Sequence, residues 1–304
     1  MDSGSLHLKL AWFAQRRLRP SFPDAPRNDE DPQLLALEAA FLEDERAAVA
    51  DAAARAPSDP KGFVSWFESL REQGPGQGDP LFPWLAKHAS LAQMRWFLTQ
   101  EVAGEAGFDD LVALTQVRMP TGAKLELARN YWDEMGRGRE AAMHGPLLSQ
   151  LAETLSLEVE PEGIVWESLA LANLLVAMAL DRRYAYHSVG ALGVVELTAP
   201  TRVGFVDEGL ARLGLSKLSR QYFTLHATLD LKHSECWNRE VLTTLAADPR
   251  AARAMAEGAL MRLRAGARVF ERYRRDLWKL KPTQGAQSGT FPLHEPRADI
   301  VAVS

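Results

Sequence analysis

The chain contains 304 residues, 46% of them hydrophobic, and carries a formal net charge of -5. A chain of this length holds one large domain or two small ones, and this hydrophobic fraction is typical of a globular protein with a sizeable core. The negative charge argues against a dedicated nucleic-acid-binding protein.

Cysteine usage and the N-terminal residues indicate a compartment. Cys236 is the single cysteine, which excludes an internal disulfide and a zinc site built from cysteines, and fits a reducing environment. Residues 1–19 lack the basic start, apolar run and cleavage site of a signal peptide. The most apolar run, Ser168 to Leu180, is too short to span a bilayer. We therefore expect a soluble cytoplasmic protein with neither a membrane nor a nucleic acid as a partner.

The first third of the chain is expected to begin irregularly and to continue as helices. Four prolines within residues 1–32 predict an irregular lead-in. Apolar residues at steps of three and four predict a helix over residues 33–55. Asp59 and Pro60 are typical of an N-cap and a first helical residue, so a short helix is expected there. After a loop rich in Gly and Pro, a long helix is expected over residues 81–106.

The rest of the chain shows the same apolar spacing with short breaks. It predicts further helices over residues 108–117, 123–135, 140–155, 164–180, 184–198, 218–245 and 251–280. Gly136 and Gly138 separate the second of these from the third, and Pro200 follows the fifth. The helix over residues 164–180 has few polar positions and should lie in the middle of a bundle.

The C-terminal part is strongly basic and ends in a tail. Ten lysines and arginines lie between Arg250 and Lys281, Arg262 among them, and we interpret them as a solvated helix face rather than a docking face for an acidic partner. Residues 282–304 are rich in Gly, Gln, Ser and Pro and predict a tail. Because no repeat, phosphate-binding loop or alternating strand pattern is found, the sequence predicts an all-α bundle in one domain over residues 33–281.

Two histidines and a carboxylate share one face of the helix expected over residues 218–245. Steps of four and seven residues lead from His226 to Asp230 and His233, which keeps the three side chains within about 40° of one another on a helix. Their neighbours are apolar, and buried ionisable groups are costly unless they are paired or bound to a metal. An amphipathic helix with an ordinary Asp–His hydrogen bond would show the same spacing.

A further histidine lies near two glycines. Glu134 and His144 are ten residues apart, and Gly136 and Gly138 lie between them. Because glycine lets a helix unwind at little cost, a local distortion would bring both side chains to one point. Glu140 is the rival partner of His144, four residues away on an intact turn. Such a pair needs no glycines, so we favour Glu134.

Glu196 is a lone carboxylate in an apolar segment. It is the only acidic residue between Asp181 and Asp207. A carboxylate in such surroundings needs a proton or a cationic partner. Pro200 cannot donate a hydrogen bond to the carbonyl of Glu196, so the backbone can bend there.

The remaining histidines are interpreted as structural. His7 and His294 lie in segments expected to be irregular, whereas His88 and His187 are interpreted as core histidines with satisfied hydrogen bonds.

With Glu101, on the helix expected over residues 81–106, the candidates amount to three imidazoles and four carboxylates. They are Glu101, Glu134, His144, Glu196, His226, Asp230 and His233. Such ligands without a thiolate suit iron or manganese. Seven groups exceed the need of one metal and suit two metals joined by a bridging carboxylate. The Glu-x-x-His repeat of ferritin-type di-iron bundles is absent from the sequence.

The order and spacing of these motifs resemble one known family. Glu134-x-Gly-x-Gly-x5-His144, the glycine-rich approach to Glu196 and the stretch from His226 to His233 are similar to motifs of the haem-oxygenase-like di-iron oxidases and oxygenases. The resemblance implies a haem-oxygenase-like helical fold and a non-haem di-iron centre that binds dioxygen.

The resemblance covers residues 80–245 and also implies a ligand set. The six matching residues are Glu134, His144, Glu196, His226, Asp230 and His233. Glu101 stands where members that add oxygen to nitrogen have an additional carboxylate, and Glu105 competes for that role.

The resemblance further implies an O2-dependent oxidoreductase that acts on a small molecule, with two Fe(II)/Fe(III) ions, O2 as co-substrate and an external reductant from an electron donor. Glu101 favours N-oxygenation of an amine or an amino-acid-derived substrate. The alternatives are oxidative C–C cleavage or desaturation of a fatty or amino acid, and a metal-free helical ligand-binding protein. Tyr222 is expected in the pocket and, with Glu134 and Glu196, in catalysis. A homodimer is the candidate assembly.

Overall fold

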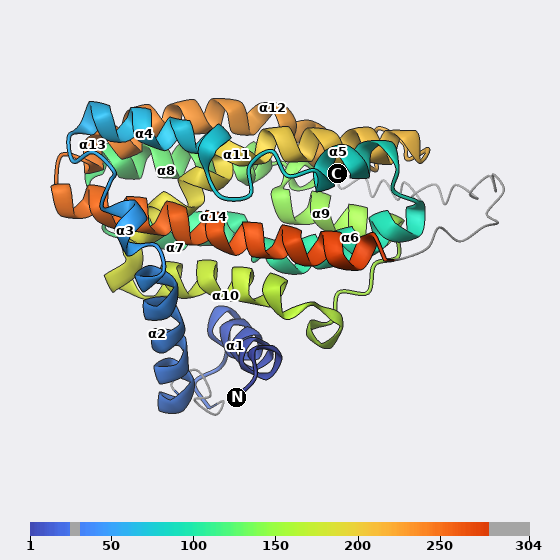
Figure 1. Ribbon diagram of the computed structural model, residues 1–304, viewed down its shortest axis with the longest axis horizontal. Coiled ribbons are helices and arrows are strands. Elements are labelled where there is room, and N and C mark those ends of the chain that lie inside the picture. The colour runs from blue at the N-terminus through green and yellow to red at the C-terminus, as the bar shows by residue number, and fades with distance from the viewer. Residues whose placement is uncertain (25–30, 280–304) are drawn as a thin grey trace, which may run out of the picture.

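The computed structural model describes residues 1–24 and 31–279, and in these ranges all regular elements are helices. Four of the longer helices pack against one another along the long axis of the molecule (Figure 1). They are α10 (Trp166–Leu180), α11 (Ala185–Arg212), α12 (Gln221–Cys236) and α14 (Pro249–Leu277). The predicted all-α architecture is confirmed, and the tail expected over residues 282–304 lies outside the described residues.

The N-terminal segment is helical over most of its length. Helix α1 (Ser3–Leu18) begins after Asp2, whose side chain accepts a hydrogen bond from the backbone N–H of Ser5. The first proline, Pro20, lies beyond the end of α1, so the prolines act only on the residues that follow it. The prediction of an irregular lead-in is therefore wrong for residues 3–18.

His7 anchors α1 on α10 and on α2 (Pro32–Ala47). Its buried ring lies with its centroid 4.8 Å from that of Phe41 and 5.7 Å from that of Trp166. Asn173 donates a hydrogen bond of 2.9 Å to the backbone carbonyl of His7. His7 is therefore a core residue and not part of an irregular end.

Five shorter helices follow α2. They are α3 (Ala50–Ala53), α4 (Pro60–Gln73), α5 (Leu81–Lys87), α6 (Leu91–Glu105) and α7 (Phe108–Thr115). The side chain of Asp59 accepts a hydrogen bond from the N–H of Gly62, which confirms the predicted cap of α4. The single helix expected over residues 81–106 is two helices, because Ser90 and Gln93 form a capping box that starts α6.

Two glycines break the next helix where the sequence predicts a break. The elements concerned are α8 (Thr121–Glu134), the 3-10 turns η1 (Gly136–Gly138) and η2 (Glu140–Ala142), and α9 (His144–Thr154). Gly136 and Gly138 have φ angles of 60° and 80°, and a Cβ atom on Gly136 would lie 2.6 Å from the backbone of Ala142. Glycine therefore permits a close turn that brings Glu134, the last residue of α8, near His144, the first residue of α9.

Two helices in the second half of the chain differ from the prediction. Helix α11 is 28 residues long and continues through Pro200. Buried residues on both sides of the proline hold the helix in the bundle. Helix α12 continues as a π-helix, η5 (Trp237–Leu242), and then as α13 (Thr243–Leu245), instead of as one regular helix. π-Helical turns occur frequently at functional sites.

The core contains α10 and α11, as expected for the former. Twelve of the 15 residues of α10 are buried. Residues 182–212, which include α11, are long and apolar enough to cross a membrane by length and composition alone, and 56% of their apolar window is buried inside the bundle. Where α11 crosses α14, a Cβ atom on Gly190 would lie 1.9 Å from the carbonyl oxygen of Met255, so the two backbones touch there.

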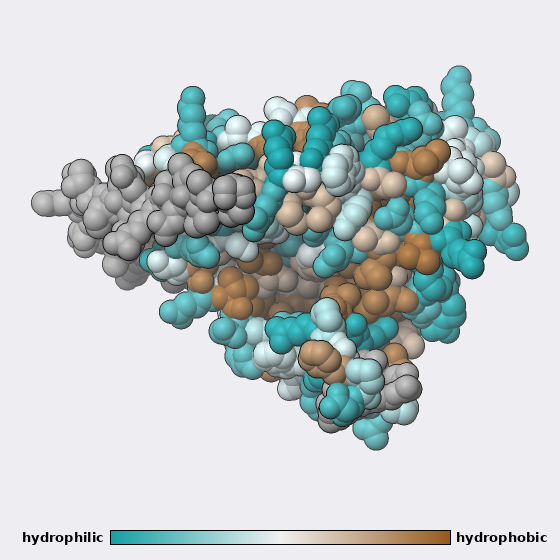
Figure 2. All heavy atoms as spheres, turned by 180° about the vertical axis from the view of Figure 1, so that it is seen from behind, coloured by the Kyte–Doolittle hydropathy of each residue, from teal (hydrophilic) through white to brown (hydrophobic). Residues whose placement is uncertain are grey.

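The rear face carries an apolar band. Figure 2 shows apolar side chains gathered between the bundle and the lower part of the molecule that holds α1 and α2. A groove of about 290 Å³ lies between α1, α6 and α10, and alanine, valine and leucine side chains make up most of its lining.

Candidate metal centre

Four helices place six of the predicted ligands in the interior and bring the ligand atoms of five of them together. Glu134 ends α8, His144 starts α9, Glu196 lies in the middle of α11, and the other three residues lie on α12. Each of these side chains belongs to a buried residue: Glu134, His144, Glu196, His226, Asp230 and His233. Glu140, the rival partner of His144, is exposed, so the glycine turn pairs His144 with Glu134 instead.

The first group of ligand atoms contains two histidines and one carboxylate oxygen. His144 Nδ1 lies 2.9 Å from Glu134 Oε2 and 3.0 Å from His226 Nε2. His226 Nε2 lies 3.4 Å from the same oxygen. Two ring nitrogens and an oxygen with converging lone pairs require a proton or a cation between them.

The second group uses the other oxygen of the same carboxylate. His233 Nδ1 lies 3.4 Å from Glu134 Oε1 and 3.4 Å from Glu196 Oε1, and it makes no hydrogen bond within the described ranges. In each group the donor atoms lie within 4.8 Å of one another. Glu134 therefore has one oxygen in each group, as a carboxylate that bridged two metal ions would have.

Asp230 is in neither group of ligand atoms among the described residues, and its carboxylate lacks a hydrogen-bond donor there. Its Oδ1 atom is buried, and no described residue makes a hydrogen bond to it. Burial, followed by the charges of Glu196 and Glu134, raises the pKa of Asp230 well above its ordinary value. A buried carboxylate oxygen without a donor is costly unless a cation binds it, so Asp230 fits the role of an additional ligand.

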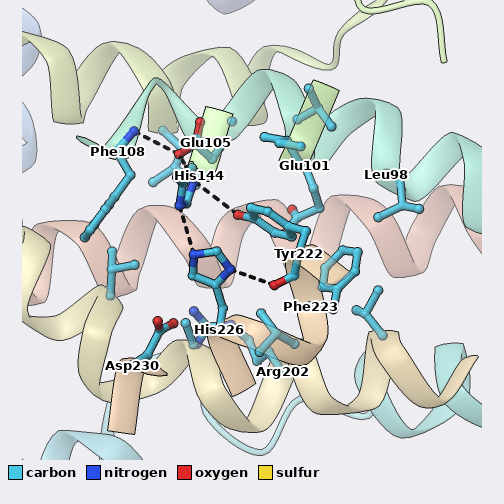
Figure 3. Close-up of a pocket in the computed structure, with 18 of the residues that line it drawn as sticks. Leu98, Glu101, Glu105, Phe108, His144, Arg202, Tyr222, Phe223, His226 and Asp230 are labelled. Atoms are coloured by element: carbon cyan, nitrogen blue, oxygen red, sulfur yellow. Dashed lines mark hydrogen bonds and ion pairs between the residues drawn. The ribbon is translucent and has the colours of Figure 1, made fainter. Parts of the chain in front are cut away.

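Each histidine uses its second ring nitrogen for an orienting contact, and two of the three contacts are drawn in Figure 3. The contacts are His144 Nε2 to Glu105 Oε1 at 2.7 Å, His226 Nδ1 to the carbonyl of Tyr222 at 2.7 Å, and His233 Nε2 to Asp133 Oδ2 at 3.3 Å. Metal-binding histidines usually donate their free N–H to such an acceptor, which fixes the tautomer and the ring orientation. The arrangement leaves the other nitrogen of each ring facing Glu134.

The groups of the centre strongly affect one another's pKa. Burial lowers the pKa of His144, but Glu105 and Glu134 outweigh burial and raise this pKa well above its ordinary value. Burial also lowers the pKa of His233, and Glu196 and Glu134 raise it to about 10. Burial raises the pKa of Glu134, and hydrogen bonds from the histidines lower it by more. The buried carboxylates therefore favour positive charge at this point, which a metal cation supplies.

Sequence reasoning missed two residues of α8 that contact the centre. Asn130 Nδ2 donates a hydrogen bond of 2.6 Å to Glu196 Oε1, and Asp133 accepts from His233. Asn130 precedes Glu134 by four residues and lies on the same side of the helix. That spacing was the available signal.

The two candidate carboxylates of α6 have different positions. Glu105 contacts His144 and accepts hydrogen bonds from the N–H groups of Gly107 and Phe108. Glu101 is in neither ligand group within the described residues. It lines the same cavity further along, and burial raises its pKa while the Tyr273 hydroxyl acts in the opposite direction.

The centre opens onto a cavity of about 150 Å³ with mostly apolar walls. Tyr222, on α12, faces this cavity, and its hydroxyl lies 3.4 Å from His144 Nε2 (Figure 3). His187 is buried and lies 3.1 Å from Glu257, as expected for a core histidine. His88 is exposed at the end of α5, so its interpretation as a core histidine is wrong.

The donor set fits iron. Three imidazoles and the buried carboxylates of Glu134 and Glu196 converge without a thiolate, and such mixed ligation suits iron or manganese. His233 Nδ1 is buried without a hydrogen-bond partner among the described residues and lies 3.4 Å from both Glu134 Oε1 and Glu196 Oε1, which leaves it free to bind an ion.

Comparisons with known proteins identify a family and a fold. A family described as iron-containing redox enzymes matches residues 95–267. A crystal structure of a CADD-like protein of unknown function from Nostoc punctiforme has a TM-score of 0.54 at 17% identity, and the match covers 75% of this chain and 99% of that chain. A second crystal structure of the same Nostoc punctiforme protein has a TM-score of 0.50 at 16% identity, and the match covers 79% of this chain and 98% of that chain. No curated protein matches the chain.

Proposed function

The chain belongs to the iron-containing redox enzyme family, and from that premise we propose that it is an O2-dependent oxidase or oxygenase with a non-haem di-iron centre. The observation that carries the proposal is the position of Glu134, whose Oε2 atom lies with His144 and His226 and whose Oε1 atom lies with His233 and Glu196. One carboxylate shared by two groups of ligands suits two metal ions better than one.

The residues divide between the ions as follows. Glu134, His144 and His226 would hold one ion, and Glu134, Glu196 and His233 would hold the other, with Asp230 as an additional ligand. When bound, the irons would supply the electrons that reduce dioxygen, and an external reductant would restore the ferrous state.

The chain's own side chains shape the reaction space around the centre. Apolar residues of α6, α11 and α12 line the cavity and limit access of water to it. The Tyr222 hydroxyl reaches towards His144 Nε2 at 3.4 Å and faces the cavity, where it can donate a hydrogen bond to a bound molecule. Burial, followed by the charge of Glu105, raises the pKa of Tyr222 well above its ordinary value, so the hydroxyl keeps its proton at neutral pH.

The preference for nitrogen depended on Glu101 as an additional ligand. Glu105, not Glu101, contacts a ligand of the centre. The proposal is therefore an oxygenase or oxidase that acts on a small metabolite, without a preference between N-oxygenation and oxidative cleavage or desaturation of an acid.

Oxygen consumption tests the proposal. The full-length chain with Fe(II) and a reductant should consume O2 faster than an equal amount of free Fe(II), and mass spectrometry after incubation with panels of amines, amino acids and fatty acids should identify a product. His226→Ala should abolish both signals, because it removes one ligand of the first group. His88→Ala, at an exposed histidine, is the matched control and should change neither. Equal O2 consumption in both variants would contradict the proposal.

A further inference from the structure

Two arginines face the cavity from different helices. Arg202 belongs to α11 and Arg262 to α14, and both line the cavity that also contains His144 and His226. The sequence analysis assigns Arg262 to a solvated helix face. The structure corrects this: Arg262 points inward, and its Nε atom is buried. Arginine is seldom placed in an interior without a partner.

Neither guanidinium has an anionic partner within the described ranges. No hydrogen bond or ion pair joins Arg202 or Arg262 to another described residue, and Arg262 Nε is among the buried atoms without a hydrogen-bond partner. Arg202 instead lies over two aromatic rings, with its Cζ atom 5.6 Å from the centroid of Phe270 and 6.0 Å from that of Phe82. A desolvated charge without a counter-ion is costly, so this part of the cavity suits an anion.

Glu101 is the carboxylate whose charge acts on both arginines. Burial raises its pKa, which disfavours the charged form. Burial, followed by the charge of Arg262, lowers the pKa of Arg202 to about 9, so Arg202 stays largely protonated at neutral pH. Asp230 also acts on Arg202, but no ion pair within the described ranges joins either guanidinium to a carboxylate.

The positions in Figure 3 separate the part of the cavity near Arg202 from the metal centre. Glu101 and Arg202 lie to the right of His144 and His226 in that view, and Asp230 lies to the left. The cavity lining is mostly apolar and includes Phe97, Leu98 and Val203, with Leu98 further to the right than Glu101 in Figure 3. Because the arginines and the two histidines line one cavity, a ligand with a charged head at the arginines would place its apolar body against the apolar lining and within the same cavity as the histidines.

We propose that the cavity binds a small substrate with an apolar body and a carboxylate group, and that Arg202 and Arg262 hold the carboxylate. A guanidinium presents paired N–H donors that match the two oxygens of a carboxylate. A cavity of about 150 Å³ is close to one that holds benzene, so an acid of about six carbons is a suitable probe. The position at which the ligand would react rests on the proposed function, whereas the binding of its carboxylate by the arginines does not.

Ligand titration tests this site. The full-length chain, loaded anaerobically with Fe(II), is titrated calorimetrically with hexanoate, hexanol, hexylamine and 2-aminohexanoate, and the iron content of each sample is measured. Hexanoate should bind about tenfold more tightly than hexanol and hexylamine. The comparison of hexanoate with 2-aminohexanoate distinguishes a fatty acid from an amino acid as the source of the carboxylate.

Variants separate the arginines from the metal as the carboxylate site. Arg202→Met and Arg262→Met should each lower hexanoate affinity about tenfold while leaving hexanol affinity and iron content unchanged, and the lysine variants should lose less. Arg250→Met is the control, since this arginine of α14 has a side chain that is 91% exposed. Equal affinities for hexanoate and hexanol in the unaltered chain overturn the proposal, as does a hexanoate affinity that needs iron and ignores both arginines. A chain that binds no iron but discriminates hexanoate from hexanol retains this site and loses the di-iron centre.

Discussion

Glu101 and Glu105 lie one helical turn apart on α6 and serve different parts of the same cavity. The chain leaves the helix through Ala106 and Gly107, both with positive φ, and the N–H groups of Gly107 and Phe108 hold Glu105 in place. Glu105 can therefore accept the Nε2 proton of His144, while Glu101 lies nearer the arginines.

This difference predicts that only one of the two carboxylates affects iron binding. Glu105→Gln should lower Fe(II) affinity about 10- to 100-fold, because it weakens the contact that orients His144. Glu101→Gln should leave Fe(II) affinity unchanged. Anaerobic titration calorimetry with Fe(II) measures both. An equal loss of affinity in Glu101→Gln would restore Glu101 as a ligand.

Spacing along the chain predicted the candidate metal ligands better than the residues that form hydrogen bonds to those ligands. The steps from His226 to Asp230 and His233 follow from helix geometry, and the two glycines indicated that Glu134 meets His144. Asn130 and Asp133 reach the centre across helix interfaces, and no periodicity within one helix specifies which partner lies on the other side. The choice between Glu101 and Glu105 depended on a local left-handed turn that the sequence does not reveal.

At the scale of the elements, the crossing of α11 and α14 depends on glycine. Gly190→Ala should lower the free energy of unfolding by about 3 kcal/mol or more, because the new Cβ atom would lie 1.9 Å from the carbonyl oxygen of Met255. Gly204→Ala, on the same helix with no atom within 4 Å of the added Cβ, should be neutral or stabilise by about 0.5 to 1 kcal/mol. Urea unfolding compares the two, and an equal loss in both would show that the crossing is not tight.

The docking of α1 predicts a dependence on pH. Burial, followed by the charge of Arg268, lowers the pKa of His7 from 6.5 to about 4. The unfolded chain therefore binds this proton more readily between these pH values, and the free energy of unfolding falls as pH is lowered from 6.5 to 4, by about 3 kcal/mol through this group. Below pH 4 the contribution changes no further.

His7→Phe is the matched test, because it keeps an aromatic ring between Phe41 and Trp166. Its free energy of unfolding, measured by urea titration at pH 6.5 and pH 4, should fall by about 3 kcal/mol less than that of the unaltered chain. The same fall in both proteins would contradict the assignment of a neutral buried imidazole.

Helix type was easier to predict than helix length. Apolar spacing and the Asp59 cap indicated the elements, but no helix was predicted over α1, and the helix that corresponds to α11 was predicted to end at residue 198, before Pro200. In both cases packing against other helices decided the outcome, and such tertiary contacts outweigh the local effect of proline. The π-helical turn η5 after α12 gave no sequence signal that we can identify.

In the whole molecule, the helical bundle forms the core, and the side chains of the candidate metal centre project into it from four helices. The similarity to the Nostoc punctiforme protein concerns the fold of this bundle, while the reaction that the site supports depends on the side chains inside it. The electron donor, the homodimer and the cytoplasmic location remain predictions from the sequence.

Counting irons tests whether Glu134 joins two ion sites. The full-length chain is titrated anaerobically with Fe(II) and analysed for bound iron and, after oxidation, for magnetic coupling by Mössbauer spectroscopy. We predict about two coupled irons per chain, loss of both in Glu134→Ala, and no loss in Glu140→Ala, which changes an exposed carboxylate of the same turn region. A single iron or none in the unaltered chain, or the same iron content in the two variants, would contradict a dinuclear centre bridged by Glu134.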